Sequence, residues 1–328
     1  MLTAGPDRAE DDQPIEILST RTGGDRIFRA LSIGSGALVL VLMGLLALFL
    51  AIEGWPALRV AGLRFLTTQD WAPDGPQRVF GVAGVLGGTV LIAVMGLALA
   101  VPVAIATALY INEYASPRIR RPMTSLIDLL AALPSLIYGI WGLFFLQPKL
   151  QGLARWMAEN LGFIPFFRTN PDVGFGNSLF VCGVVVGLMI LPIATSVIRE
   201  VLSRAPRDQC ESAYALGGTR WGMIRDVILP FGRSGIVGGA MLALGRALGE
   251  TIAVTIILSA TNRLTAHVLE PGGGSVAALI AVEFKGAGPF ELHALAAAGL
   301  SLFVLTLLVN MGARYIVNRA RSEVGLAL

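Results

Sequence analysis

Two ionisable residues, Arg246 and Glu250, lie inside a long apolar run in the second half of the chain. If this run, Ser234–Ser259, is one membrane-spanning helix, Arg246 lies about 18 Å inward from Ser234, at 1.5 Å per residue. That depth is near the middle of a hydrocarbon core of about 30 Å, where an uncompensated charge costs several kcal/mol. Residues four apart share a helix face, so the spacing predicts that the two side chains neutralise each other.

The chemistry of this pair favours an anion pathway. A guanidinium group offers a planar pair of donors to an oxyanion and stays charged at physiological pH. Ionisable residues at membrane depth are by default pathway residues, and the alternative is a structural ion pair that pins the helix to its neighbours. Because Glu250 repels an anion, we expect it either to hold Arg246 when the pathway is empty or to accept a hydrogen bond from a protonated oxyanion.

Four further polar residues are weaker candidates for the same pathway. Pro134 and Pro192 interrupt their apolar runs, and a kink exposes neighbouring polar groups to a passage. Hydroxyl groups in membrane helices more often bond their own backbone or an adjacent helix, which favours packing. The candidates beside these prolines or beside Glu250 are Ser135, Tyr138, Thr195 and Thr251. Close helix packing is also the prediction for the glycines Gly235, Gly238 and Gly239.

The elements that position these residues are membrane-spanning helices. Hydrophobic residues make up 55% of the chain and charged residues 14%, against about 25% charged residues in a soluble domain. Ala30–Ile52 and Leu292–Ala313 contain no charged residue and exceed the length of about 20 residues that crosses a bilayer. We therefore predict an all-α integral membrane protein with six transmembrane helices. The other four are expected at Gly88–Tyr110, Pro122–Leu146, Ser178–Ile198 and Ser234–Ser259.

The distribution of Lys and Arg predicts the orientation. The N-terminal tail, the 111–122 and 199–234 loops and the C-terminus together hold 16 of these residues, and the three alternate loops hold 8. The positive-inside rule then places both termini and the 199–234 loop in the cytoplasm. The alternate loops contain Pro-Gly turn signals, which predict short structured pieces outside the membrane.

The sequence contains none of the patterns expected of an energy-converting site. Its two lysines, Lys149 and Lys285, are followed by Leu and Gly, whereas a P-loop needs Lys followed by Ser or Thr. His267 and His293 have no cluster of metal-binding residues around them, so we expect neither a metal nor a cofactor. Energy for uphill transport would have to come from an ion gradient or from another subunit.

The 199–233 loop carries the sequence Glu211-Ser-Ala-Tyr-Ala-Leu-Gly217, nine residues, and then Val227-Ile-Leu-Pro230. This pattern predicts a short helix, a glycine turn, and a second helix that Pro230 ends ahead of the next span. It resembles the E-A-A-x3-G-x9-I-x-L-P loop of permease subunits of binding-protein-dependent ABC importers, with Ser212 and Val227 as departures. The resemblance implies a coupling helix that docks on an ATPase through Glu211, Ser212, Ala213, Gly217 and Pro230.

A second motif narrows the resemblance. The stretch Gly245-Arg-Ala-Leu-Gly-Glu-Thr-Ile-Ala-Val254 is similar to the G-R-A-L-G-E-T-x-A-V helix of the PstC-type permeases of phosphate-specific ABC importers. Supporting stretches begin at Ala108, Asp128 and Ile190, and the resemblance runs from about residue 80 to the C-terminus. It implies a type I ABC importer (MetI-like) fold with a five-helix core plus an N-terminal helix, in a bacterial plasma membrane.

The resemblance also implies an assembly around a subunit that is not itself an enzyme. The expected partners are a PstA-type second permease, two PstB-type ATPase subunits, an extracytoplasmic PstS-type phosphate-binding protein, membrane lipid and inorganic phosphate. The expected domains are a disordered acidic cytoplasmic tail (1–25), a first span with its external loop (26–79), the permease domain (80–320) and a cytoplasmic tail (321–328).

Two other function classes remain as alternatives. One is an ABC permease for a different oxyanion. The other is a gradient-driven secondary carrier, which inverted repeats or an ion site formed by broken helices would favour. The coupling loop argues against a channel or a structural scaffold.

Overall fold

A computed structural model describes residues 23–169, 174–258 and 267–325, with side chains up to Tyr315. By their internal contacts residues 1–48 and 49–328 form two units, and each is described by itself. Most of the predicted disordered tail, residues 1–22, lies outside the described residues.

The first helix, α1 (Gly23–Ala61), passes from the first unit into the second. Its part in the first unit exposes apolar side chains on all sides, as expected of a helix surrounded by lipid. Its end in the second unit packs against α12 (Pro289–Gly325), because a Cβ on Gly54 would lie 2.8 Å from the backbone nitrogen of Ala297. Nearby, the Glu53 carbonyl oxygen lies 2.7 Å from Nδ1 of His293.

Five helical segments within the described residues are long and apolar enough to cross a membrane, and a bent pair brings the total to six. The prediction of an all-α protein with six spans is confirmed if the bent pair counts as one span. The spans of the second unit include α2 (Ala83–Leu109), α6 (Leu179–Leu202), α9 (Leu229–Leu248) and α12.

The third predicted span, Pro122–Leu146, is the bent pair, and the interruption predicted at Pro134 is confirmed. The bend of 93° lies between α3 (Pro117–Ala132) and a second helical segment. That segment consists of α4 (Ser135–Trp141), a π-helical turn (Gly142–Leu146) and α5 (Gln147–Asn160). Pro134 cannot donate a backbone hydrogen bond, and Leu133 before it adopts an extended conformation. The helix therefore ends there and restarts in a new direction.

The core of the second unit is built where α2, α6 and α9 pack together. Small residues allow close approach: a Cβ on Gly96 of α2 would lie 3.2 Å from the backbone nitrogen of Gly187 on α6. Gly232 of α9 would likewise meet the Leu202 side chain of α6. These contacts fix α9 against α6 and so determine which side of α9 remains uncovered.

One end of the second unit carries the short structured pieces that the turn signals predict. A hairpin pairs β1 (Trp71–Ala72) with β2 (Val79–Phe80). Phe80 makes edge-to-face contacts with Phe65 and Phe290. The remaining pieces are the 3₁₀ turns Gly62–Leu66 and Pro165–Phe167 and the helix α11 (Val276–Glu283).

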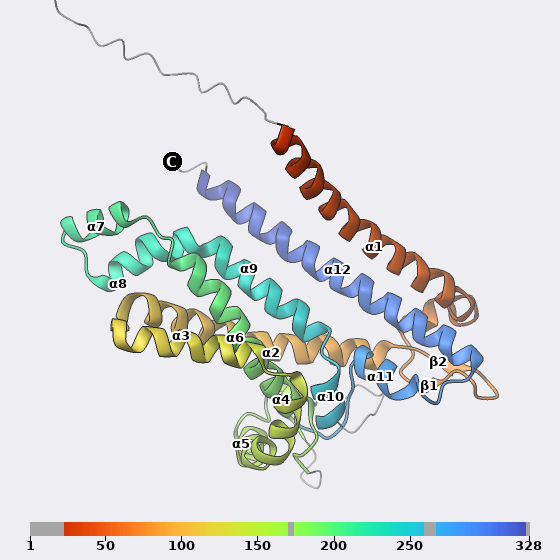
Figure 1. The fold of residues 1–328 in the computed structure, drawn as a ribbon. Helices are drawn as coiled ribbons and strands as arrows, with labels where there is room; N and C mark the ends of the chain where they lie inside the picture. Colours follow the sequence, from red (N-terminus) through yellow and green to blue (C-terminus); the bar gives the residue numbers. More distant parts are fainter. Residues whose placement is uncertain (1–22, 170–173, 259–266, 326–328) are drawn as a thin grey trace, which may run out of the picture. The chain divides into compact units, whose positions relative to one another are not determined.

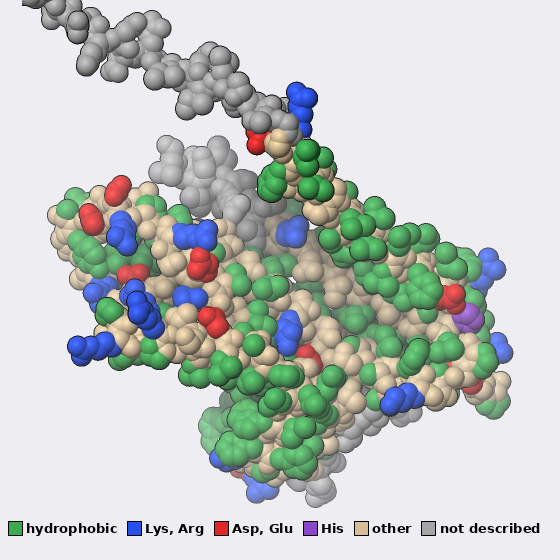
Figure 2. All heavy atoms as spheres, viewed as in Figure 1, with side chains coloured by type: hydrophobic (Ala, Val, Ile, Leu, Met, Phe, Trp, Pro, Cys, Tyr) green, Lys and Arg blue, Asp and Glu red, His purple; other side chains and the backbone are tan. Residues whose placement is uncertain are grey.

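The other end carries α7 (Arg207–Ala215) and α8 (Arg220–Met223), away from the hairpin (Figure 1). On the face shown in Figure 2, charged side chains gather over this end. Helix α8 continues through a π-helical turn (Ile224–Ile228) into α9, so the prediction that Pro230 ends this helix was wrong. The π-helical turn ends two residues before Pro230. Pro230 has no N–H for a helical hydrogen bond, and its ring would clash with the carbonyl of residue 226 in a regular α-helix.

Candidate functional site

The end of α9 is broken where the sequence predicts one continuous helix. Helix α9 stops at Leu248, and α10 (Ile252–Ile257) begins after Gly249, Glu250 and Thr251. The prediction of one span over Ser234–Ser259 was therefore wrong, and its last residue lies outside the described residues. Because α9 ends between them, Arg246 and Glu250 do not share one helix face.

Glu250 accounts for the break. Its carboxylate Oε1 accepts a hydrogen bond from the backbone nitrogen of Ala253 at 3.2 Å, and the side chain is 6% exposed. A side chain that satisfies a free N–H at the start of a helix favours a new start over continuation. In the part of the chain that the structure describes, Glu250 makes no ion pair with Arg246. The predicted neutralising pair does not form, and the carboxylate caps α10 instead.

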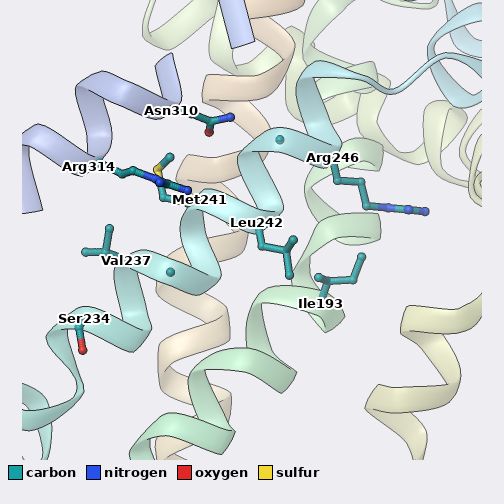
Figure 3. A pocket seen from close by; sticks show the side chains of 10 residues that line it. Ile193, Ser234, Val237, Met241, Leu242, Arg246, Asn310 and Arg314 are labelled. Carbon is teal, nitrogen blue, oxygen red and sulfur yellow. The ribbon is translucent and has the colours of Figure 1, made fainter. Parts of the chain in front are cut away.

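Arg246 lines a cavity of about 800 Å³ along α9, which we call the α9 groove (Figure 3). Its guanidinium group extends from α9 away from α12, whereas Arg314 and Asn310 extend from α12 toward α9 (Figure 3). Helix α6 contributes one residue. The α9 groove is lined by Ile193, Ser234, Val237, Gly238, Met241, Leu242, Gly245, Arg246, Asn310 and Arg314.

The other predicted pathway residues do not line the α9 groove. Thr195 is fully buried, and its hydroxyl donates to the Leu191 carbonyl at 2.8 Å. The Thr251 hydroxyl donates to the Gly249 carbonyl at 3.2 Å within the break. Both contacts satisfy the local backbone, as the packing interpretation of these hydroxyls predicts.

Tyr138 and Ser135 belong to the bend between α3 and α4. Ser135 is the first residue of α4, and the Tyr138 hydroxyl donates to the Leu130 carbonyl at 2.9 Å. That carbonyl lies in the last turn of α3, where it also accepts a hydrogen bond from the backbone nitrogen of Leu133 at 3.3 Å. Tyr138 therefore stabilises the bend.

The two broken spans meet beside the α9 groove. A Cβ on Gly139 of α4 would lie 3.0 Å from the Cα of Ala253 on α10, so the half-helices that follow the two breaks pack directly together. Arg246 lies two residues before the end of α9, next to the break in its span. The arginine is thus presented next to two interrupted helices.

Sequence reasoning missed Arg314, Asn310 and Ser234 as residues of the same cavity. Arg314 entered the sequence argument only as a positive charge flanking the last span. Asn310 lies four residues earlier on α12, so a shared helix face was the available signal. Nothing in the sequence indicates that this face of α12 lies opposite α9.

The first part of the predicted coupling loop forms the short helix and the glycine turn that its sequence predicts. Glu211 and Ser212 are exposed on α7, and Gly217 turns the chain with φ of +80°. The turn is held by a bond from the Gly218 nitrogen to the Ala213 carbonyl at 3.0 Å. Pro230 lies beyond the turn in the continuing helix.

Apolar side chains project from this charged end of the molecule. The exposed fractions of Leu216, Trp221 and Tyr214 are 89%, 61% and 43%. The Cys210 thiol is partly buried on α7, and burial, followed by the negative charges of Glu113 and Glu211, raises its pKa. Exposed aromatic and aliphatic side chains on a charged loop are typical of a surface that binds a protein partner.

Three comparisons with known proteins agree with one another. A family model described as binding-protein-dependent transport system inner membrane component matches residues 100–322. The phosphate transport system permease protein PstC 2 of Mycobacterium tuberculosis is 42% identical over 300 residues, which are 90% of this chain and 92% of the relative. PstC of Mesorhizobium japonicum is 39% identical over 306 residues, 92% of each chain.

Solved structures show the same fold at low identity. A chain of the bacterial alginate ABC transporter, in complex with an alginate pentasaccharide-bound periplasmic protein, matches with a TM-score of 0.59 and 18% identity. The match covers 92% of this chain and 98% of that chain.

Proposed function

This chain belongs to the family of binding-protein-dependent transport system inner membrane components, and we propose that it is the PstC-type permease subunit of an ATP-driven phosphate importer. The observation that carries the proposal is its 42% identity, along 90% of its length, to a phosphate transport permease. The protein is a multi-pass membrane protein that forms part of an ABC transport system.

The proposed passage is the α9 groove, with Arg246 as the contact for phosphate. A guanidinium group at membrane depth needs a counter-charge, and Glu250 is engaged with the start of α10 rather than with Arg246. A phosphate that passes along the groove supplies that counter-charge transiently, through paired hydrogen bonds from the planar donor group. Glu250 has the role of shaping the break in the span.

The proposed partners follow from the family. Energy comes from two PstB-type ATPase subunits that bind α7 and the Gly217 turn, since we assign this chain no nucleotide site of its own. Exposed Leu216 and Trp221 would fill a groove on that partner. A PstA-type permease completes the passage, and a PstS-type protein delivers phosphate at the hairpin end.

The proposed orientation places both termini and the end that carries α7 and α8 in the cytoplasm. A cytoplasm-active reporter fused after Asp208 should be active, and the same reporter fused after Gly273 should be inactive. The opposite pattern would refute both the orientation and the assignment of the docking loop.

The substrate is tested by phosphate uptake in cells that lack their own phosphate importers. Cells that express this chain with its partner subunits should accumulate radiolabelled phosphate, and excess sulfate should not compete. Competition by sulfate with poor phosphate uptake would favour a permease for another oxyanion. Uptake that persists without the ATPase and collapses with the proton gradient would favour a secondary carrier.

A further inference from the structure

The α9 groove has cationic side chains on both sides. Arg246 comes from α9, and Arg314 comes from α12 together with Asn310 (Figure 3). Asn310 and Arg314 are four residues apart on one helix, so they share the face that borders the groove. On α9 the lining residues extend from Ser234 to Arg246, about 18 Å at 1.5 Å per residue.

The lining of the groove matches an anion. Two arginines, an asparagine and a serine contribute its polar side chains, and no carboxylate is among the described residues that line it. Within the described part of the chain, neither Arg246 nor Arg314 forms an ion pair. Two cations that share a cavity without a carboxylate create a positive potential that attracts anions.

Two glycines of α9 leave room in the groove. Gly238 and Gly245 line the groove, and a Cβ built on either of them would have no atom within 4 Å. The groove also reaches Ser234, close to the end of α9 that leads to α8. The lining residues thus extend along α9 from Arg246 toward that end.

We propose that Arg314 and Asn310 form a second oxyanion contact in the α9 groove, through which phosphate leaves Arg246 on its way to the cytoplasm. This inference rests on the phosphate-import function proposed above. A single deep cation holds an anion too well for rapid release, whereas a second, more exposed contact divides the exit into two smaller steps. Arg314 is exposed, so it binds phosphate more weakly than a buried arginine would.

A thiol-labelling experiment on the assembled complex tests the electrostatic part of the inference. Asn310→Cys is introduced in a Cys210→Ser background, where the remaining Cys182 is fully buried. Two methanethiosulfonate reagents are compared, an anionic sulfonate and a cationic trimethylammonium compound. The measured quantity is the rate at which the thiol introduced at position 310 reacts with the anionic reagent, divided by its rate with the cationic one. Adding Arg314→Gln should lower this ratio by about threefold to tenfold, because one positive charge beside the thiol is removed.

The matched control is Arg121→Gln, which removes an exposed arginine from α3, outside the groove. This change should leave the ratio unaltered. The inference would be overturned if Arg314→Gln left the ratio of labelling rates equal to that of the parent variant with Asn310→Cys and Cys210→Ser. Arg314 would then not attract anions into the groove. An equal fall with Arg121→Gln would also overturn it, because the effect would come from net charge alone.

Phosphate uptake tests the transport part. Arg314→Gln should lower the maximal rate by about threefold to tenfold at parental membrane abundance. The half-saturating phosphate concentration should not change, because capture occurs at the other end. Arg314→Lys should restore most of the rate, since charge matters more than fork geometry at an exposed contact.

Two outcomes separate the inference from the function on which it rests. Parental uptake rates in Arg314→Gln would refute the exit role even if the labelling ratio falls. If the parental complex imports no phosphate, the proposed function fails, and the labelling ratio still decides whether Arg314 makes the groove attractive to anions.

Discussion

The two faces of α9 use the same residue type for opposite purposes. On one face, Gly235 and Gly239 lie against α6. A Cβ added to Gly235 would collide with the Val201 side chain, and one added to Gly239 would lie 2.8 Å from that of Ile198. On the other face, Gly238 and Gly245 border the α9 groove, where added Cβ atoms would meet nothing within 4 Å. Glycine brings two helices together on the first face and leaves open space on the second.

This difference between the two faces corrects the packing prediction for the glycines of α9. Close packing was predicted for all three glycines of the run, and it is confirmed for Gly235 and Gly239 but wrong for Gly238. The packed face anchors α9 to α6, so the groove face keeps a defined position without contacts of its own. Substitutions on the packed face should therefore affect assembly, and substitutions on the groove face should affect transport.

The largest effect is expected from a matched pair of leucine substitutions. Gly235→Leu forces a large side chain into the α6 contact at a cost of about 3 kcal/mol or more, so little protein should remain in the membrane. Gly238→Leu should keep parental abundance and lower phosphate uptake, because its side chain enters the groove. Immunoblots of membranes beside uptake assays measure both, and equal abundance of the two variants would remove the distinction between the faces.

Arg246→Lys should abolish most transport while the protein stays abundant. The ammonium group keeps the charge but loses the planar donor pair, so we expect uptake to fall about tenfold or more. Phosphate uptake by the Arg246→Gln variant should fall at least as far. Parental uptake by the lysine variant would show that the donor geometry is irrelevant on the groove face.

Glu250 should behave as a helix cap rather than as the partner of Arg246. Glu250→Gln keeps an acceptor for the Ala253 nitrogen and should be mild, whereas Glu250→Ala should cost about 1 kcal/mol of stability. The double variant Arg246→Gln with Glu250→Gln should transport no better than Arg246→Gln alone, because there is no pair to rebalance. Recovery of uptake in the double variant would restore the ion-pair interpretation.

The smallest effect is expected from Thr195→Val on α6. The Thr195 hydroxyl donates only to the backbone of its own helix, and the side chain is buried away from the groove. Uptake and abundance should both stay near parental values, within about 1 kcal/mol in stability. A selective loss of uptake would mean that Thr195 contacts the substrate.

The sequence predicts the elements better than their interruptions. Long uncharged runs identify the spans, and the position of Gly217 identifies the turn of the coupling loop, because each depends on local composition. The break after Leu248 depends on a competition in which Glu250 captures the Ala253 nitrogen, and helical spacing alone does not reveal it. Pro134 signals an interruption, but neither the 93° angle nor the contact between α4 and α10 can be read from the spacing of residues.

The candidate site was only partly predictable for a related reason. Arg246 is conspicuous because it is charged within an apolar run. Arg314 resembles any other basic residue that flanks a membrane span, and its place in the groove depends on how α12 lies beside α9. Residues joined only by tertiary contact leave no mark in the spacing of a single sequence.

The central claim is the proposal that phosphate passes along the groove face of α9, and a cysteine scan of α9 tests it most directly. In the assembled complex with Cys210→Ser, cysteines at the positions of Ser234, Gly238, Leu242 and Gly245 should react with an anionic thiol reagent, and phosphate should slow the reaction. Cysteine at the position of the buried Ala243 should not react. Equal reactivity on both faces, or labelling confined to the packed face, would contradict the account.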